Sequence, residues 1–323
     1  MRPILVVGSV NMDVVCAVDR IPVPGQTVMG QDVHFFHGGK GANQAMGIAR
    51  LGHPVRMVGR VGDDSTGTRL RAALRAGGVG VRHIATTPRM PSGLALIVTD
   101  RRGENSIVVS PGANARLTPR DVQPLATLLR SCAMVLLQLE IPLETVDRVT
   151  LLAQRAGVPV MLDPAPARDL PPRLLRRITW LTPNESEAAY LCGAHATMPV
   201  RRASAAAYAM ALRARGCGTV IVTLGRRGSC VAAPDGGSYT VPAFRVRSVD
   251  STAAGDAFNA GLAVALARGD PLADAVRYGS AVAAVSVTRR GAQPSMPTAS
   301  DVRQLLRSTV AVASAVGRRW RQT

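Results

Sequence analysis

Strand-like and helix-like segments alternate along the second half of the chain, and this alternation restricts the fold more than any other feature. Short apolar runs at residues 134–139, 159–162, 178–181 and 219–223 are mixed with helical patterns, of which 119–130 and 143–156 are the clearest. Polar residues follow these runs, among them Glu140, Asp163 and Asn184. Such alternation favours βαβ units and a parallel sheet, and open α/β sheets bind ligands beyond the carboxyl ends of their strands. The sequence therefore predicts an α/β protein, in one large domain or two smaller ones, with a ligand site at that edge.

The first half of the chain predicts one more buried strand and then extended pieces. Residues 4–8 are typical of a strand, and Asn11 and Asp13 follow two residues apart, on one side of an extended chain, where they could hold two sugar hydroxyls. Both are also common turn residues, and the stretch by itself favours a turn. Helices are expected at 42–50 and 63–75, on either side of a strand at 55–59. The proline-interrupted stretch 14–33 and the paired strands 93–99 and 105–110 indicate a flap.

Small residues meet a carboxylate in Asp250-Ser-Thr-Ala-Ala-Gly-Asp-Ala-Phe-Asn259, where a helix over about 254–267 is predicted to begin. Ala253, Ala254 and Gly255 leave room for an anion at the free N–H groups and positive dipole end of that helix. Asp256 would then accept the proton of a hydroxyl that attacks a bound phosphoryl group. The alternative is that Asp256 only favours the helix start.

The glycine-rich stretch Gly38-Gly-Lys-Gly-Ala-Asn43 allows a ligand to approach the backbone closely. It is not a Walker A loop, because His34 and Gly41 stand where that motif needs glycine and Ser or Thr. Lys40 is the only lysine in a chain that otherwise uses arginine. Either a compact ammonium is needed there or a single lysine has survived by chance.

Three further stretches suggest nucleotide and cation binding. Asn184 and Glu187, three residues apart at a predicted helix start, would position hydrated magnesium or form a capping pair. Thr223 and the glycine turn at 225–228 offer a hydroxyl and N–H groups to phosphates. Spare carbonyl groups in the irregular stretch 289–295 bind a monovalent cation or simply close the loop.

The net charge of +18 raises the possibility of nucleic-acid binding, but the distribution of the charge disfavours it. The arginines form scattered pairs, no zinc-finger or RNP motif is present, and aromatic residues are only 3% of the 323 residues, too few for a base-stacking platform. The 47% of hydrophobic residues provide a large core.

No apolar run approaches the roughly 18 residues of a membrane span, and the chain begins without a signal-peptide layout. We therefore expect a cytoplasmic protein with no membrane partner. The five cysteines include no C-x-x-C pair, which favours core thiols over a zinc or redox centre.

Taken together, the motifs strongly resemble the ribokinase-like carbohydrate kinase family, which includes minor phosphofructokinases, fructokinases and adenosine kinase. The resemblance covers about residues 4–307. Eight motifs carry it in the family's order: Gly8-Ser-Val-Asn-Met-Asp13, Gly38-Gly-Lys-Gly-Ala-Asn-Gln-Ala45, Gln138-Leu-Glu140, Pro164-Ala-Pro-Ala-Arg168, Thr182-Pro-Asn-Glu-Ser-Glu187, Thr223-Leu-Gly-Arg-Arg-Gly228, Asp250-Ser-Thr-Ala-Ala-Gly-Asp-Ala-Phe-Asn259 and Arg290-Gly-Ala-Gln-Pro-Ser295.

The resemblance implies a doubly wound, mostly parallel α/β sheet in a single domain over 1–310, with a basic tail at 311–323. It also implies a small β lid, made of pieces at about 12–38 and 91–112, that pairs with its copy in a homodimer. The cofactors implied are ATP, Mg²⁺ and an activating K⁺.

Site residues follow from the same resemblance. The sugar site comprises Asn11, Asp13, Gly39, Lys40, Gly41, Ala42, Asn43, Glu140 and Asp256. Asp256 is the expected base, with the amides of Ala254 and Gly255 as the anion hole. The ATP site comprises Asn184, Thr223, Leu224, Gly225, Arg226, Arg227, Gly228, Gly255, Asp256 and Ser280, with Glu187 organising magnesium indirectly. The monovalent cation loop comprises Asp250, Thr252, Ser286, Arg289, Gly291 and Ser295.

The expected reaction is phosphorylation of the 5-hydroxyl of D-ribose by ATP. Two residues depart from the family's pattern: Ser280 stands where histidine or asparagine is often found near the adenine, and Asp163 stands where asparagine is usual in the ribose-specific members. The alternatives are a kinase for deoxyribose, another sugar or a nucleoside. A further alternative is a nucleic-acid-binding or sugar-sensing protein on the same fold, which would need catalysis to have been lost.

Overall fold

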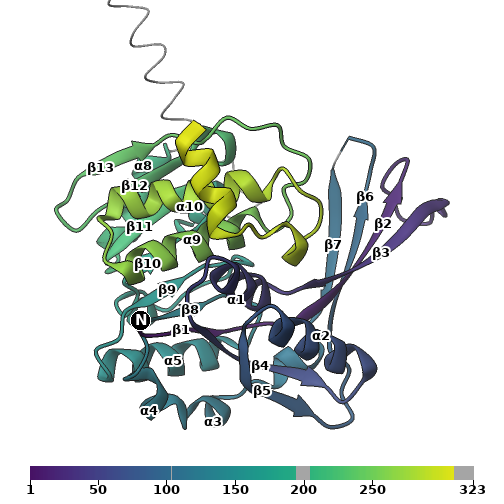
Figure 1. Ribbon diagram of the computed structural model, residues 1–323, viewed down its shortest axis with the longest axis horizontal. Coiled ribbons are helices and arrows are strands. Elements are labelled where there is room, and N and C mark those ends of the chain that lie inside the picture. The colour runs from purple at the N-terminus through teal and green to yellow at the C-terminus, as the bar shows by residue number, and fades with distance from the viewer. Residues whose placement is uncertain (103, 194–203, 309–323) are drawn as a thin grey trace, which may run out of the picture.

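The computed structural model describes residues 1–102, 104–193 and 204–308 (Figure 1). Its elements, in chain order, are β1 Ile4–Val7, β2 Asn11–Val18, β3 Gly30–Gly38, α1 Lys40–Arg50, β4 Val55–Gly62, α2 Ser65–Ala76, β5 Gly80–Thr87, β6 Gly93–Thr99, β7 Asn105–Ser110, η1 Gly112–Arg116, α3 Pro119–Val122, α4 Leu125–Leu129, β8 Met134–Leu137, α5 Leu143–Arg155, β9 Val160–Leu162, α6 Pro172–Leu175, β10 Trp180–Leu181, α7 Glu185–Leu191, α8 Ala205–Ala214, β11 Thr219–Thr223, η2 Gly225–Arg227, β12 Ser229–Ala232, β13 Ser238–Val241, α9 Ala254–Arg268, α10 Leu272–Ser286 and η3 Gln293–Ser295.

A large sheet forms the body of the protein, with strands in the order β13-β12-β11-β10-β9-β8-β1-β4-β5. In this order, each strand from β11 across to β5 pairs in parallel with its neighbour. β12 and β13 are added beyond β11 as an antiparallel hairpin. The order of strands reverses beside β1, because β4 and β5 lie on one side of it and β8 to β11 on the other. The doubly wound, mostly parallel sheet expected from the sequence is therefore confirmed.

Helices cover both faces of this sheet, and β1 shows why its sequence is continuously apolar. Ile4 and Val6 point into a core shared with α1, α2, α9 and α10, whereas Leu5 and Val7 point into a second core shared with α5, α7 and α8. All four side chains are fully buried. A strand covered on both faces needs apolar residues at every position rather than at alternate ones.

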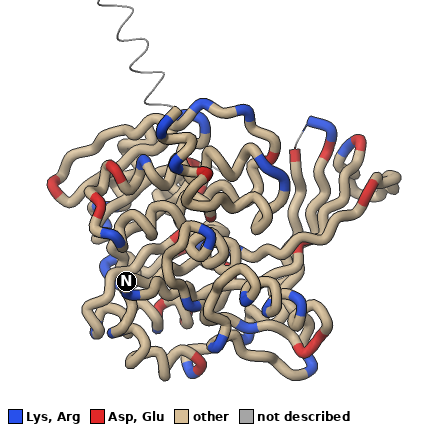
Figure 2. Tube along the Cα trace, in the orientation of Figure 1, with Lys and Arg blue, Asp and Glu red and all other residues tan. Residues whose placement is uncertain are grey.

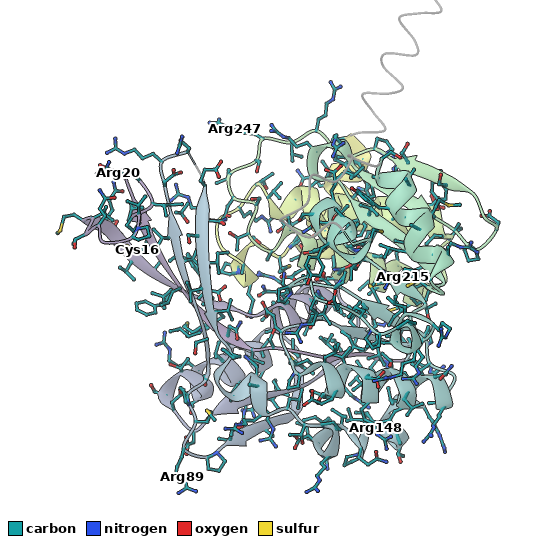
Figure 3. The ribbon with its side chains drawn as sticks, turned by 180° about the vertical axis from the view of Figure 1, so that it is seen from behind. Cys16, Arg20, Arg89, Arg148, Arg215 and Arg247 are labelled. Atoms are coloured by element: carbon teal, nitrogen blue, oxygen red, sulfur yellow. The ribbon has the colours of Figure 1, made fainter. Side chains whose placement is uncertain are left out.

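A second sheet of four strands, in the order β3-β2-β6-β7, forms the lid. It is built from two separate parts of the chain, because β2 pairs antiparallel with β3 and parallel with β6. Figures 1 and 3 show this sheet projecting from one side of the body, with Cys16 and Arg20 on the lid and Arg148 and Arg215 on the body. The two flap pieces expected from the sequence thus join into one sheet.

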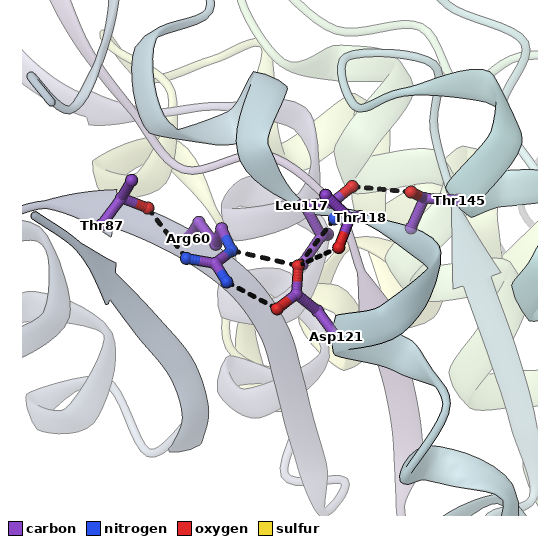
Figure 4. A network of polar contacts seen from close by, with 6 residues as sticks. All are labelled: Arg60, Thr87, Leu117, Thr118, Asp121 and Thr145. Atoms are coloured by element: carbon purple, nitrogen blue, oxygen red, sulfur yellow. Dashed lines mark hydrogen bonds and ion pairs between the residues drawn. The ribbon is translucent and has the colours of Figure 1, made fainter.

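Polar contacts tie the connection before β8 to the main sheet (Figure 4). The Arg60 guanidinium on β4 forms an ion pair with Asp121 at 2.5 Å, and it also donates to the Thr87 hydroxyl on β5 at 3.1 Å. Asp121 in turn forms a capping box with Thr118 at the start of α3. The helix expected over 119–130 begins at Pro119 but is divided at Gln123 and Pro124 into the short helices α3 and α4.

Several elements differ from the sequence predictions. The turn interpretation of Asn11 and Asp13 is wrong, because both lie within β2. The strands β5, β12 and β13 were not predicted. β5 and β13 lie at the edges of the sheet and carry exposed polar residues, and β12 is a buried strand of only four residues. The expected basic tail at 311–323 lies outside the described residues.

Lys and Arg residues are dispersed over the body and the lid rather than gathered in one region (Figure 2). Among the described residues, no helix is both long and apolar enough to cross a bilayer.

Candidate active site

A cleft of about 740 Å³ lies between the lid and the body. Predicted site residues that line it are Asn11, Asp13, Gly39, Lys40, Asn43, Glu140, Asp250, Thr252, Asp256 and Gly291. The predicted residues Gly41 and Ala42 are buried beneath its wall in α1. Of the predicted nucleotide residues, only Asp256 lines this cleft, and the others lie at the starts of α7 and α9, at the end of β11, in and beside η2, and on α10.

Asn11 is held in the cleft by a residue that the sequence analysis missed. The amide nitrogen of Asn114 donates to Asn11 Oδ1 at 2.7 Å, and Asn114 also bonds both main-chain groups of Val10. Because the Asn11 oxygen is already satisfied, its amide nitrogen is the group left for a ligand. Asn114 lies in η1 after the lid strands, so no local sequence signal connected it to Asn11.

Asp13 lies two residues further along β2 and is also buried. Burial is the largest cause that raises its pKa to about 7, and the negative charges of Glu140 and Asp256 raise it further. Lys40 opposes these effects. The carboxyl group of Asp13 therefore changes its charge near neutral pH, unlike an ordinary aspartate.

The start of α1 is packed tightly under the cleft, which explains its glycines. Gly39 caps the helix with φ of 86°. A Cβ on Gly41 would lie 2.8 Å from the backbone of Gly8, at the end of β1. This close approach places Ser9 at the helix start, where its hydroxyl donates to Glu140 at 2.5 Å, and Glu140 also accepts from the Lys40 N–H at 3.2 Å.

Asp256, the expected base, is 4% exposed in the first turn of α9. Its Oδ2 accepts from the Asn43 amide at 2.9 Å and its Oδ1 accepts from the Gln44 amide at 3.0 Å. Burial raises its pKa, whereas Lys40 and the two amide donors lower it, and the net shift is upward. Helix α1 thus supplies both of the donors that hold this carboxyl group.

The N-terminus of α9 presents free donors to the cleft. Ala253 adopts the left-handed conformation with φ of 58°, which turns the chain into the helix. The N–H groups of Gly255 and Asp256 donate to no described residue, and a Cβ on Gly255 would meet nothing within 4 Å. The Ala254 N–H instead donates to the Ser251 carbonyl at 3.2 Å, so it would have to leave that carbonyl to contact an anion.

Lys40 is surrounded by carboxyl groups. Burial lowers its pKa, but Asp256, Asp163 and Glu140 raise it by more, and the net pKa lies above the usual value of a lysine. The Lys40 side chain therefore stays an ammonium group at neutral pH and partly balances these negative charges.

Asn184 and Glu187 form the capping box that the sequence analysis gave as the alternative to magnesium binding. Asn184 Oδ1 accepts from the Glu187 N–H at 2.9 Å, and Glu187 Oε2 accepts from the Asn184 N–H at 2.8 Å. The second carboxylate oxygen of Glu187 bonds to no described residue. Burial raises the pKa of Glu187, because its carboxyl group is only partly exposed to water.

The glycine turn after β11 lies beside this capping box. Asn184 and Thr223 form an isolated parallel bridge, and Gly225 at φ of 55° has open space around it. The Arg227 guanidinium reaches Glu185 on α7 at 2.5 Å. Ser280 is 8% exposed in the middle of α10.

The predicted cation loop is closed by Asp250. Its two carboxylate oxygens accept from the N–H groups of Thr252 and Gly291, each at 2.8 Å, and so join the stretch before α9 to the stretch after α10. The side chain of Arg289 forms an ion pair with Asp301 at 3.1 Å and is directed to that carboxylate.

Several main-chain carbonyl oxygens in this loop are free to bind a cation. The main-chain carbonyls of Asp250, Thr252, Arg289 and Gly291 accept no bond from any described residue, whereas the Ser286 carbonyl accepts from the Arg289 N–H at 3.0 Å. The hydroxyls of Ser286 and Ser295 lie 2.9 Å apart.

The doubly wound sheet, the lid and a buried carboxyl group at a helix start are the features of a ribokinase-like kinase. The model of the pfkB family carbohydrate kinases matches residues 1–299. The chain belongs to this family.

The chain is similar to ribokinases along its whole length. It is 41% identical to the ribokinase of Bacillus subtilis over 306 residues, which cover 95% of this chain and 100% of that protein. The crystal structure of ribokinase from Thermotoga maritima has a TM-score of 0.86 at 35% identity and covers 95% of this chain and 100% of its own. The structure of Arabidopsis thaliana ribokinase complexed with ribose and ATP has a TM-score of 0.85 at 33% identity, with 94% and 98% covered.

Proposed function

We propose that this protein transfers the γ-phosphoryl group of ATP to the 5-hydroxyl of D-ribose, with Asp256 as the general base. One observation carries the proposal: a buried carboxyl group lies beside two unpaired N–H groups at the start of α9, in a cleft lined by Asn11, Asp13 and Lys40. The substrate is inferred from the ribokinases to which the chain is similar.

In this reaction the sugar hydroxyl loses its proton to Asp256 as its oxygen bonds to the γ-phosphorus, and the bond to the ADP oxygen breaks. The Gly255 and Asp256 N–H groups and the dipole of α9 would stabilise the negative charge on the transferring group. Asn11, Asp13 and Asn43 would hold the sugar hydroxyls, and the lid would exclude water.

The nucleotide would lie along α7 and the turn at 225–228. Mg²⁺ would be held by the phosphates and, through water, by the free carboxylate oxygen of Glu187, where it neutralises phosphate charge. Thr223 and the open turn at Gly225 would accept the phosphates, and Ser280 would lie near the adenine.

A monovalent cation, K⁺ in our proposal, would occupy the loop closed by Asp250 and be held by its free main-chain carbonyls. Its contribution when bound is to neutralise these oxygens and fix the loop. The loop itself leads from Thr252 directly into Ala253 and the start of α9.

The outer face of the lid supports a homodimer. Phe35, Val14, Leu96 and Val108 lie opposite one another on successive strands, and Phe35, Leu96 and Val108 are 61%, 49% and 64% exposed. An apolar row of this kind on a sheet is typical of a covered surface, and we propose that a second copy of the lid covers it.

We also propose that residues 1–310 act as one kinase domain with a separate basic tail, and that the protein works in the cytoplasm. All five cysteines are free thiols, which fits a reducing compartment.

The substrate is tested by measuring ADP release with ribose, deoxyribose, fructose, adenosine and uridine at equal concentrations. We expect the highest kcat/KM with ribose. Higher kcat/KM with deoxyribose or a nucleoside would assign the protein to that substrate. No turnover with any of the five would favour the sugar-sensing or nucleic-acid-binding alternative.

A further inference from the structure

Gln44 connects two buried carboxyl groups, one on a helix and one at the end of a strand of the main sheet. It lies in α1 and is 1% exposed. Its amide nitrogen donates at 3.0 Å to Asp256 Oδ1, on α9, and at 3.0 Å to Asp163 Oδ2, just after β9. Both hydrogens of this amide are therefore used, one on each carboxyl group.

The orientation of the Gln44 amide is fixed by a third side chain. Gln138, which follows β8 and is 1% exposed, donates to Gln44 Oε1 at 2.6 Å. If the Gln44 amide were flipped, its oxygen would face the oxygens of both carboxyl groups, and its nitrogen would face the Gln138 donor. The burial of all these groups makes such mismatches costly, so one orientation is strongly preferred.

The two helices that carry Gln44 and Asp256 are held at a fixed separation. Gly47, one turn after Asn43 on α1, faces Ala260 on α9, and a Cβ on Gly47 would lie 2.7 Å from the Ala260 methyl group. The close packing of these helices sets the distance across which the Gln44 amide reaches Asp256.

We propose that Gln44 is a positioning residue for phosphoryl transfer: anchored by Asp163 and Gln138, its amide holds the Asp256 carboxyl group in the orientation that receives the proton. This inference rests on the proposed role of Asp256 as the base. The Asn43 amide, which holds the other oxygen, faces the cleft, so Gln44 provides the contact on the buried side. The charged groups around Asp256 are Lys40, Glu140, Asp163, Asp13 and Glu187.

The test removes the amide while keeping the length of the side chain. Gln44→Met should lower kcat by about 10- to 100-fold, because small displacements of a catalytic group cost rate on that scale. The KM for ATP should change little, because Gln44 bonds to Asp256 but to none of the predicted nucleotide residues at the start of α7, in the turn at 225–228 or on α10.

Repeating the substitution in the Asp256→Asn variant separates a positioning role of Gln44 from a general effect on the fold. When Asp256→Asn has already removed the base, adding Gln44→Met should leave the residual kcat unchanged, since there is no base left to position. If Gln44→Met lowers the residual kcat by the same factor in both backgrounds, the proposal is wrong. If Asp256→Asn alone keeps normal turnover, the proposed function itself fails, and this is a different result.

Asp163 provides a test that does not depend on the folding of the Gln44 variant. Asp163→Ala and Asp163→Asn both remove the charge, but only asparagine keeps an oxygen that accepts from Gln44. We expect Asp163→Ala to lower kcat by at least fivefold and Asp163→Asn to recover most of that loss. Equal kcat values in the two variants would contradict the anchoring role.

Thr145→Val is the matched control, because it removes another buried hydrogen bond, from the Thr145 hydroxyl to the Leu117 carbonyl at 2.6 Å (Figure 4), and neither residue lines the cleft. It should lower Tm and leave kcat unchanged. A loss of kcat like that of Gln44→Met in this control would show that the fold alone explains the effect.

Discussion

Gly38 lies so close to the carboxyl group of Asp13 that a Cβ on Gly38 would be 2.0 Å from Oδ2. The two residues lie on neighbouring lid strands, β3 and β2, at the base of the cleft. The absence of a side chain at Gly38 is therefore what allows Asp13 to occupy its position.

Gly38→Ala should displace Asp13 and weaken sugar binding. Overpacking of this kind costs about 1–3 kcal/mol, and if this energy is lost from sugar binding the ribose KM should rise by about 5- to 150-fold. The KM for ATP should change little. Gly237→Ala is the control, because a Cβ there meets only the flexible Asp235 side chain, at 3.5 Å. An unchanged ribose KM in Gly38→Ala would show that the position of Asp13 does not matter for the sugar.

Ribose binding should depend on pH near neutrality. Because the pKa of Asp13 is raised to about 7, chiefly by burial, the group is a carboxylate acceptor above that pH and a neutral acid below it. The ribose KM should therefore rise as the pH falls from 8 to 6. In Asp13→Asn the KM should be higher and independent of pH over this range. A parent KM that stays flat would contradict this assignment.

The carboxyl group of Asp13 should also make the ligand-free protein less stable at higher pH. The pKa of Asp13 in the folded state, about 7, lies above the ordinary aspartate value of 3.8, so the folded state binds the proton more tightly. This contribution to stability is present below pH 3.8 and is lost as the pH rises through about 7. The Tm of Asp13→Asn should therefore exceed that of the parent at pH 8 by more than at pH 5.

Potassium should activate the enzyme more than sodium or lithium at equal ionic strength. The free carbonyls around Asp250 would hold a weakly hydrated cation in the proposed site, and the loop leads into α9. Asp250→Ala removes both bonds that close the loop and should abolish the preference. Equal initial rates in the three chloride salts would rule out the cation site.

Charge placed on the outer face of the lid should dissociate the dimer. Phe35→Glu introduces a carboxylate at one end of the apolar row, on the edge strand β3, and light scattering coupled to size-exclusion chromatography should then give the mass of a monomer. Met29→Glu is the control, because Met29 is 87% exposed but lies outside the lid strands. A monomeric parent protein would contradict the proposal directly.

The sequence predicted the architecture well, because the strands near β1 are apolar at every position and the helices between them are strongly patterned. Several residues predicted for the sugar site, among them Asn11, Asp13 and Glu140, line the cleft, whereas most residues predicted for the nucleotide lie outside it. The lid could be expected as two flap pieces, but the pairing of β2 with β6 is a long-range contact that no local pattern encodes.

The supporting residues were harder to predict. Gln44 and Gln138 lie within the quoted motifs but appeared there without a role, because their function depends on a contact between α1 and the end of β8. Asn114 likewise holds Asn11, and Ser9 holds Glu140, through hydrogen bonds between residues distant in the sequence. The amide of Ala254 was expected in the anion hole, but it donates to the Ser251 carbonyl. This bond could not be foreseen because the sequence does not indicate that Ala253 adopts the left-handed conformation.

The most direct test of the account is the turnover of Asp256→Asn. The substitution keeps the shape of the side chain and removes the proton acceptor, so kcat should fall by about 10²–10⁴-fold, the range for a positioned base. Tm should fall only moderately, because one of the donors from Asn43 and Gln44 keeps an oxygen partner. The affinity for MgATP should hold or improve, since a negative charge near the triphosphate is lost. A kcat within threefold of the parent, with a lowered Tm, would instead show that Asp256 serves only the start of α9.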